Sequence, residues 1–174
     1  SAFFARFSDP NFFNSLFFLV MGTVLTLCVQ SSAAIMAITM ILCSTGVLHI
    51  DQGIMLVLGE NIGTTITANI VALSANTQAR RAALAHFTIN VIGVFWVVLV
   101  LKWFLAAVCH VVGYDLSIGP GDAGYADNLK KISVVLATFH SAFNVSNTFL
   151  QIWFVKYIEK FVCKIIKPKN TEDL

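Results

Sequence analysis

The sequence predicts an all-helical, polytopic membrane protein that contains a re-entrant hairpin and a broken transmembrane helix. Composition is the first observation behind this prediction, since 57% of the 174 residues are hydrophobic and 11% are charged, whereas soluble domains carry about 25% charged residues. The second observation is a series of apolar runs, each about as long as a bilayer-crossing helix. The third is a pair of polar clusters, residues 30–32 and 59–65, which lie between or within these runs at depths where unsatisfied polar groups are costly.

The chain begins with a mixed segment, residues 1–10, which we interpret as interfacial or as the end of an upstream element. Two apolar runs follow at 11–29 and 33–48, separated by Gln30-Ser31-Ser32. Each run has about the length needed to cross a bilayer once, so two full spans are one interpretation. A re-entrant hairpin with Gln30-Ser31-Ser32 at its tip is preferred, because a buried tip places a half-helix terminus at the depth of a solute site.

The next apolar run, residues 54–73, follows a polar break at 49–52 and contains a second polar cluster. This cluster, residues 59–65, reads Gly-Glu-Asn-Ile-Gly-Thr-Thr. Glycine permits a non-helical backbone, and an unwound stretch would free carbonyl groups to coordinate a cation. We therefore expect the transmembrane helix to be broken here.

The rest of the chain alternates between polar loops and apolar spans. Residues 74–81 are predicted to form a short loop. Residues 82–112 would make a helix of about 45 Å, which must tilt or extend beyond a hydrocarbon core of roughly 30 Å. An extracytoplasmic loop at 113–128, a final transmembrane helix at 129–160 and a basic cytoplasmic tail at 161–174 complete the prediction.

The basic residues predict the orientation of the chain. Arg80 and Arg81 adjoin in a predicted loop, and five lysines gather near the C-terminal end: Lys156, Lys160, Lys164, Lys167 and Lys169. Because Lys and Arg mark the cytoplasmic side, we place both regions there and the 113–128 loop outside, in a plasma (inner) membrane protein. A basic tail next to a membrane span does not indicate nucleic-acid binding, and no nucleic acid is expected as a partner.

The cluster Gln30-Ser31-Ser32 offers an amide and two hydroxyls, which can both donate and accept without net charge. That chemistry suits a small anion bound together with cations. A helix starting at Ala33 would also direct its backbone N–H groups at the cluster, which favours an anion. The alternative is interhelical contact, since Ser, Gln and small residues commonly pack membrane helices.

The cluster at 59–65 carries oxygen ligands of the hard type that small cations prefer. Asn61, Thr64 and Thr65 supply them, and Thr67 continues the polar face. Glu60 is the lone acid of this region and could be a cation ligand, a proton-coupling group or an interfacial residue. The alternative is a helix kink in which hydroxyls bond back to carbonyls of their own helix.

Two His-x-x-x-Asn pairs, His86 with Asn90 and His140 with Asn144, each stand near the start of a predicted span. The i, i+4 spacing places both polar groups on one helix face, where they could line a cavity or take part in coupling. A buried histidine in helix packing is the alternative. The four cysteines form no C-x-x-C pair, so neither a disulfide framework, a transition-metal site nor a cofactor is expected.

Three stretches, residues 29–33, 58–68 and 80–87, together with Asn90, resemble the type II sodium–phosphate cotransporter family, which has bacterial as well as animal members. The combination is specific, whereas Gln-Ser-Ser alone is weak. The likeness runs from about Thr23 to about Gly93. The stretch Leu-Ala-His-Phe-x-x-Asn resembles the second of the two repeats of the family more closely.

The resemblance implies sodium-coupled uptake of inorganic phosphate by alternating access, with Na⁺ as the coupling ion. Family members contain two inverted repeats, each with a Gln-Ser-Ser-Ser motif, and the paired motifs form the site. The implied phosphate-binding residues are Gln30, Ser31, Ser32, Thr64 and Thr65. The implied sodium-binding residues are Ser31, Asn61, Thr64, Thr65 and Thr67. Residues 11–112 would be the cotransporter repeat, and a PhoU-like domain could follow the Lys-rich end.

Two departures from the family pattern are visible. Ala33 stands where the family has the third serine of the motif, which removes one hydroxyl. The chain holds a single Gln-Ser-Ser cluster, so it would be one inverted-repeat half. The abrupt start at Ser1 suggests a fragment, with the other half upstream; the alternative is a second protomer paired in inverted orientation.

Three rival functions follow from the same residues. An intramembrane hydrolase using Ser31 or Ser32 with His86 lacks an orienting acid and a nucleophile-elbow pattern, so the chain is not expected to be an enzyme. A non-transporting structural or regulatory subunit would use the clusters as helix contacts. The same scaffold could also carry another small anion or export phosphate.

Overall fold

The computed structural model describes residues 12–168, and within them the chain forms helices and connecting turns but no strand. The all-helical prediction is confirmed. Residues 1–11 and 169–174, which include the predicted N-terminal segment and the last six residues of the basic tail, lie outside the described residues. The elements in chain order are α2 (Phe12–Val29), α3 (Ser32–Ser44), α4 (Ile50–Ala72), α5 (Thr77–Leu99), α6 (Leu101–Val112), α7 (Tyr125–Gln151), the 3₁₀ turn η1 (Ile152–Phe154) and α8 (Val155–Ile165).

Three of these helices, α2, α4 and α5, are long and apolar enough to cross a membrane. The apolar helices α3 and α6 have 13 and 12 residues. At 1.5 Å per residue each is about 20 Å long or less, shorter than a hydrocarbon core of roughly 30 Å. Large apolar side chains such as Val24, Ile38 and Phe95 are exposed on several helices, as expected for surfaces that face lipid.

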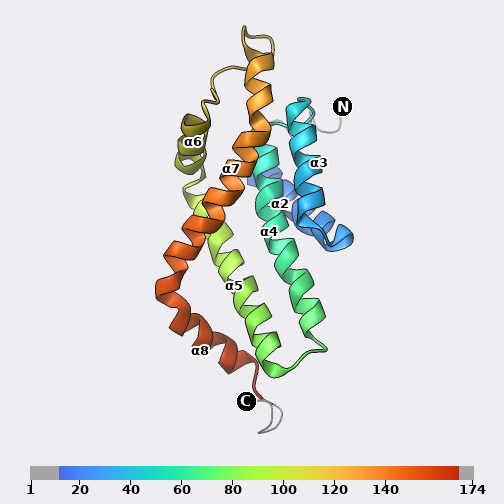
Figure 1. Ribbon diagram of the computed structural model, residues 1–174, viewed down its shortest axis with the longest axis vertical. Coiled ribbons are helices and arrows are strands. Elements are labelled where there is room, and N and C mark those ends of the chain that lie inside the picture. The colour runs from blue at the N-terminus through green and yellow to red at the C-terminus, as the bar shows by residue number, and fades with distance from the viewer. Residues whose placement is uncertain (1–11, 169–174) are drawn as a thin grey trace.

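The helices are arranged around α4, which contacts α2, α3, α5 and α7. Figure 1 shows the loop between α4 and α5 and the C-terminal end of α8 at the lower end of the molecule, and the loop between α6 and α7 at the upper end. The turn that joins α2 to α3 lies between these ends, near the middle of the long axis. The hairpin formed by α2 and α3 therefore turns back inside the height of α4.

The backbones of α2 and α4 touch, and glycines make this possible. A Cβ added to Gly22 would collide with the carbonyl oxygen of Leu56, and a Cβ added to Gly59 would collide with that of Leu19. Gly63 is similarly close to α2, since an added Cβ would lie 2.7 Å from the backbone of that helix. Small residues permit such close approach between membrane helices, so the two glycines of residues 59–65 serve packing.

The prediction of a broken helix at residues 59–65 is wrong. Helix α4 is continuous from Ile50 to Ala72. Its glycines do not unwind it, because their missing side chains are used to admit α2. The two helices are joined further by Thr23 Oγ1, which donates to the Leu19 carbonyl at 2.9 Å and to the Gly59 carbonyl at 3.1 Å.

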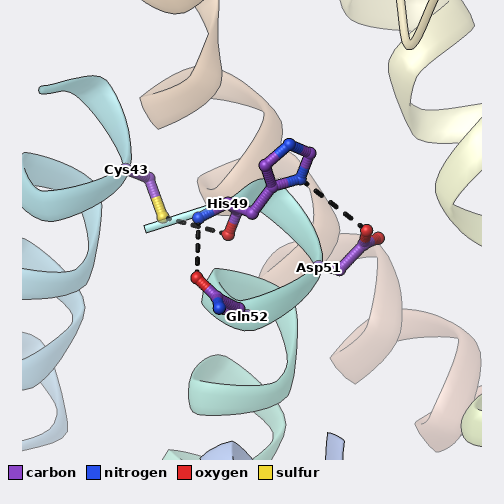
Figure 2. Close-up of polar contacts among 4 residues, drawn as sticks. All are labelled: Cys43, His49, Asp51 and Gln52. Atoms are coloured by element: carbon purple, nitrogen blue, oxygen red, sulfur yellow. Dashed lines mark hydrogen bonds and ion pairs between the residues drawn. The ribbon is translucent and has the colours of Figure 1, made fainter. Parts of the chain in front are cut away.

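The turn between α3 and α4 is held by side-chain bonds that Figure 2 shows. Gln52 Oε1 accepts from the backbone N–H of His49 at 2.8 Å, which satisfies a donor at the start of α4. Cys43 Sγ donates to the His49 carbonyl at 3.8 Å and ties the end of α3 to this turn. His49 Nδ1 lies 3.9 Å from Asp51 at the exposed edge.

Helix α5 begins earlier than predicted, so Arg80 and Arg81 lie in its first turns and not in a loop. Asn76 is the N-cap, and its side chain accepts from the Ala79 N–H at 2.9 Å. An asparagine in this position satisfies one of the free donors of a helix start. The predicted loop at 74–81 is therefore reduced to a few residues before Thr77.

The two later spans differ in detail from the prediction. The run at 82–112 is divided at Val100 into α5 and α6, and the following loop ends where α7 begins at Tyr125. Helix α7 ends at Gln151, and η1 turns the chain into α8, which packs back on α5. Helix α8 has Ile158 and Val162 buried and its lysines exposed. This amphipathic pattern keeps α8 against the bundle and prevents one straight helix over 129–160.

Candidate functional site

The break between α2 and α3 consists of Gln30 and Ser31. Gln30 has φ 57°, the one positive φ of a non-glycine residue within residues 12–168. Its backbone N–H still donates to the Thr26 carbonyl at 2.7 Å, which closes the last turn of α2. The side chain of Gln30 is exposed and makes no hydrogen bond to the described residues. A left-handed glutamine is strained, and the turn presents its amide freely.

Ser31 is the N-cap of α3, and its Oγ accepts from the Ala34 N–H at 3.3 Å. The Ser31 carbonyl accepts from the Ile35 N–H at 3.3 Å. The N–H groups of Ser32 and Ala33 find no acceptor between residues 12 and 168. Free N–H groups at a helix start carry a positive partial charge and are suited to an anion.

The polar side chains of α4 bond to carbonyls of their own helix. Asn61 Nδ2 donates to the Val57 carbonyl at 2.9 Å. Thr64, Thr65 and Thr67 donate their hydroxyl protons to carbonyls three or four residues earlier, at 2.7–2.8 Å. These bonds to carbonyls of the same helix are the ones that the alternative interpretation of residues 59–65 predicts, but the helix is continuous here. Asn61, Thr64 and Thr67 are partly exposed, whereas Thr65 is buried.

Glu60 is fully buried and lies against α3. Its Oε1 accepts from Thr39 Oγ1 at 3.2 Å, and its Oε2 has no partner among the described residues. Thr26 of α2 is buried nearby, with its Cβ close to Gly63, and its hydroxyl also lacks a partner within residues 12–168. Glu60 is thus closed off from solvent in this conformation.

The contact between Thr39 and Glu60 sets the relative heights of α3 and α4. Ser32 precedes Thr39 by seven residues and Thr67 follows Glu60 by seven, and the two helices run in opposite directions (Figure 1). At 1.5 Å per residue both lie about 10 Å from that contact toward the lower end. The start of α3 and the hydroxyls of α4 therefore share a depth, but no hydrogen bond joins them in the described part of the chain.

A hollow of about 280 Å³ lies between α3 and α7, and Ser32, Met36, Met40, His140 and Ser141 are among its lining residues. His140 Nδ1 is buried and has no hydrogen-bond partner between residues 12 and 168. The Asn144 side chain donates to the His140 carbonyl at 2.9 Å and does not reach the hollow. The structure thus brings His140 beside the start of α3.

The other His-x-x-x-Asn pair lies apart from this hollow. His86 is exposed on α5, and Asn90 is buried and donates to the His86 carbonyl at 3.1 Å. The two pairs share the same local bond, from the asparagine amide to the histidine carbonyl four residues earlier. Their sequence likeness therefore reflects a helical bonding pattern, and it does not place both histidines in one site.

A polar cluster between α5 and α7 was not anticipated from the sequence. Gln151 Nε2 donates to the Ile89 carbonyl and to Asn147 Oδ1, both at 2.6 Å. Asn147 Oδ1 also accepts from Trp96 Nε1 at 3.1 Å, and Asn147 Nδ2 donates to Ile89 at 3.2 Å. Asn147 fits beside Gly93, which has no room for a Cβ. The feature of the sequence that could have indicated this cluster is the spacing of Asn147 and Gln151, which places their side chains on one face of a helix.

The helices and the interrupted hairpin define an integral membrane protein with a polar turn at mid-height. The family profile described as Na⁺/Pi-cotransporter matches residues 10–112, which is more than half of the chain. The chain therefore belongs to the Na⁺/Pi-cotransporter family, a transporter family and not an enzyme family.

Several curated proteins resemble the chain. It is 40% identical over 89 residues to the uncharacterized protein YqeW of Bacillus subtilis, covering 51% of this chain and 28% of that protein. It is 38% identical over 88 residues to human sodium-dependent phosphate transport protein 2C, covering 48% and 14%. The rabbit protein 2A is 37% identical over 101 residues, covering 55% and 16%. The aligned part of the chain thus spans between about a seventh and about a quarter of these relatives. No solved structure matches the chain.

Proposed function

We propose that this chain is one inverted-repeat half, the second repeat, of a sodium-coupled symporter that takes up inorganic phosphate by alternating access. The observation that carries the proposal is the family match over residues 10–112. The names of relatives 2A and 2C, sodium-dependent phosphate transport proteins, support phosphate as the substrate and Na⁺ as the coupling ion. Transport requires no covalent chemistry from the protein.

In this proposal α2 and α3 form a re-entrant hairpin, and Gln30-Ser31-Ser32 is its tip. Two features support a hairpin over two full spans. Helix α3 has 13 residues, about 20 Å, which is too short for a core of roughly 30 Å. The turn between the two helices lies near the middle of the molecule (Figure 1) and not at an end.

Phosphate would bind at the start of α3. The N–H groups of Ser32 and Ala33, the free amide of Gln30 and the Ser32 hydroxyl all stand at this turn as donors. Ser31 would act chiefly through the cap that fixes this geometry, because its Oγ already accepts from Ala34. Thr64 and Thr65 of α4 were predicted as further phosphate ligands, and the partly exposed Thr64 is the better placed of the two.

Sodium would bind along α4 without any unwinding. A threonine that donates its proton to a carbonyl of its own helix keeps its oxygen lone pairs free. Thr64 and Thr67 are in this state and partly exposed, and Asn61 Oδ1 is free to act as an acceptor because only its Nδ2 is used. These are hard oxygen ligands. Ser31 and Thr65 complete the proposed set, and Glu60 is a buried candidate for coupling.

The complete site would need the matching motif from the other repeat of the full-length protein or from a second protomer. We place the assembly in the plasma (inner) membrane with Arg80, Arg81 and α8 on the cytoplasmic side, where a PhoU-like domain could follow. The basic residues at the start of α5 and on α8 support this orientation, because Figure 1 shows the start of α5 and the end of α8 at the lower end. His140, beside Ser32, would line the cavity, whereas Asn90 and Asn144 would act in helix packing.

The test is uptake of radiolabelled phosphate into proteoliposomes that hold the full-length protein, with and without an inward sodium gradient. We expect sodium-dependent uptake that is lost in Gln30→Ala and in Asn61→Ala while folded protein is retained. Uptake that does not depend on sodium would contradict the coupling. Absence of flux with folded, inserted protein would favour a non-transporting subunit, and flux of a different labelled anion would correct the substrate.

A further inference from the structure

A second recess lies away from the proposed site, between α5, the end of α7 and α8. It has a volume of about 620 Å³, within the range of small-molecule sites, and its walls are almost entirely apolar. Ile92 and Trp96 line it from α5, and Phe154, Tyr157, Ile158 and Phe161 line it from η1 and α8. A hollow of this size and character suits a hydrocarbon chain.

A smaller hollow of about 360 Å³ shares Ile158 with this recess. Most of its lining is apolar, but we call it the polar hollow because charged side chains also line it. Gln78 and Arg81 line the polar hollow from α5, and Glu159 and Cys163 line it from α8. Because both hollows are lined by α5 and α8 and share Ile158, we treat them as one groove, whose polar part differs from the rest by its charged side chains. We call it the α5–α8 groove.

Arg81 gives the polar part of the groove its recognition chemistry. Its Nε donates to the Ile166 carbonyl at 3.0 Å, which fixes the guanidinium beside α8. The terminal Nη groups make no hydrogen bond or ion pair to residues 12–168. Glu159 lines the same hollow but forms no ion pair with Arg81 within those residues. A planar guanidinium with free paired donors matches a phosphate group.

The side chains on α8 around Arg81 are also mainly positively charged. Lys156, Lys160 and Lys164 are exposed on α8, so cations outnumber the single Glu159 on this helix. Basic residues next to a membrane-embedded apolar surface recognise anionic lipids. We propose that the α5–α8 groove binds one anionic phospholipid, with an acyl chain in the apolar recess and the headgroup phosphate at Arg81.

Native mass spectrometry of the full-length protein in detergent tests this, with phosphatidylglycerol and phosphatidylcholine titrated separately. We expect the wild type to bind phosphatidylglycerol about tenfold more tightly. Arg81→Gln should remove most of that preference, and Arg81→Lys should keep part of it. The matched control is Arg80→Gln, which removes a neighbouring charge that does not line the groove and should leave the preference unchanged.

Two further variants test separately the contacts with the acyl chain and those with the lipid headgroup. Ile92→Trp fills the apolar recess and should weaken binding of both lipids. Glu159→Gln removes the opposing charge and should strengthen binding of phosphatidylglycerol. Equal binding of the two lipids by the wild type, or equal losses in Arg80→Gln and Arg81→Gln, would overturn the proposal. Displacement of lipid by inorganic phosphate, or a change of oligomeric mass in Ile92→Trp without a change in lipid binding, would also overturn it. Transport is not measured, so this result is independent of the symport test.

Discussion

At the scale of single residues, Gln30 is the position where backbone conformation and side-chain chemistry conflict. Its φ of 57° is one that glycine adopts freely and glutamine does not. Left-handed backbone costs a non-glycine residue roughly 1–2 kcal/mol. The glutamine is not explained by the turn, since glycine would form it with less strain. The proposed role of its side-chain amide in phosphate binding would account for the residue.

Gln30→Gly is therefore expected to keep or raise the free energy of unfolding, by up to about 1 kcal/mol, while sodium-dependent phosphate uptake falls at least about tenfold. Gln30→Ala should lose uptake to the same degree without the gain in stability. Thermal unfolding in detergent and proteoliposome uptake measure the two effects separately. Full uptake by Gln30→Gly would show that the turn alone matters.

The neighbouring serines are expected to respond differently. Ser31→Ala removes a helix cap and should lower the free energy of unfolding by about 1 kcal/mol, so its loss of uptake combines two causes. Ser32 Oγ makes no hydrogen bond to other residues of 12–168, so Ser32→Ala should leave the unfolding midpoint unchanged and still reduce uptake. If Ser32→Ala destabilised the protein as much as Ser31→Ala, Ser32 would be a structural residue.

At the scale of elements, the contact of α2 with α4 depends on glycines whose neighbours are backbone atoms. A Cβ at Gly59 would meet the Leu19 carbonyl, which cannot rotate away. A Cβ at Gly53 would meet the buried Cys43 Sγ and a methyl group of Leu136, and these side-chain atoms can shift further than a backbone carbonyl can. The same substitution at the two positions therefore separates overpacking against backbone from overpacking against side chains.

Gly59→Ala should lower the free energy of unfolding by about 1–3 kcal/mol, exceeding the gain in helix propensity of about 1 kcal/mol. Gly53→Ala should change it by a smaller amount, because side chains can adjust. Thermal unfolding of the purified variants measures the difference. Equal stability of Gly59→Ala and the wild type would mean that α2 and α4 separate easily.

The all-helical fold and the apolar runs could be predicted from the sequence because they depend on length and composition, whereas the re-entrant hairpin stays a prediction. The sequence does not predict whether the backbone of residues 59–65 is helical or unwound, because glycine favours both an unwound helix and close helix packing. Which of these occurs depends on whether another helix, here α2 with its Gly22, fits against it. The division at Val100 has no Gly or Pro to mark it, and it follows from packing of α6 on α7.

At the scale of the whole molecule, the hollow between α3 and α7 joins residues more than a hundred positions apart, Ser32 and His140. The sequence named both residues as candidates but gave no reason to pair them, since their proximity is set by helix packing over a long separation. The hydrogen bond from Trp96 to Asn147 could not be predicted either, because it forms only when α5 and α7 lie side by side. The sequence therefore indicates which residues are candidates for a site, but it does not predict which of them lie beside one another.

If the hairpin shifts relative to α7 during transport, a cross-link across this hollow should stop it. The variant carrying Met36→Cys and Ala137→Cys, two other lining positions of the hollow, treated with a short bifunctional thiol reagent with a cleavable disulfide spacer, is expected to lose phosphate uptake and regain it on reduction. Each single variant, treated in the same way, is the control. Unchanged uptake by a fully cross-linked double variant would place the conformational change elsewhere.

The backbone contact of α2 with α4 also has a mechanical consequence. Because carbonyl groups and glycine Cα atoms touch without intervening side chains, there is little compliant material between the two helices to absorb a displacement. A tilt of α4 is therefore expected to move α2 and the turn at its end as well. If sodium binds to the hydroxyls of α4, as proposed, a movement of α4 would also move the phosphate donors at the turn after α2. Sodium binding and phosphate binding would then be coupled through the contact between these two helices.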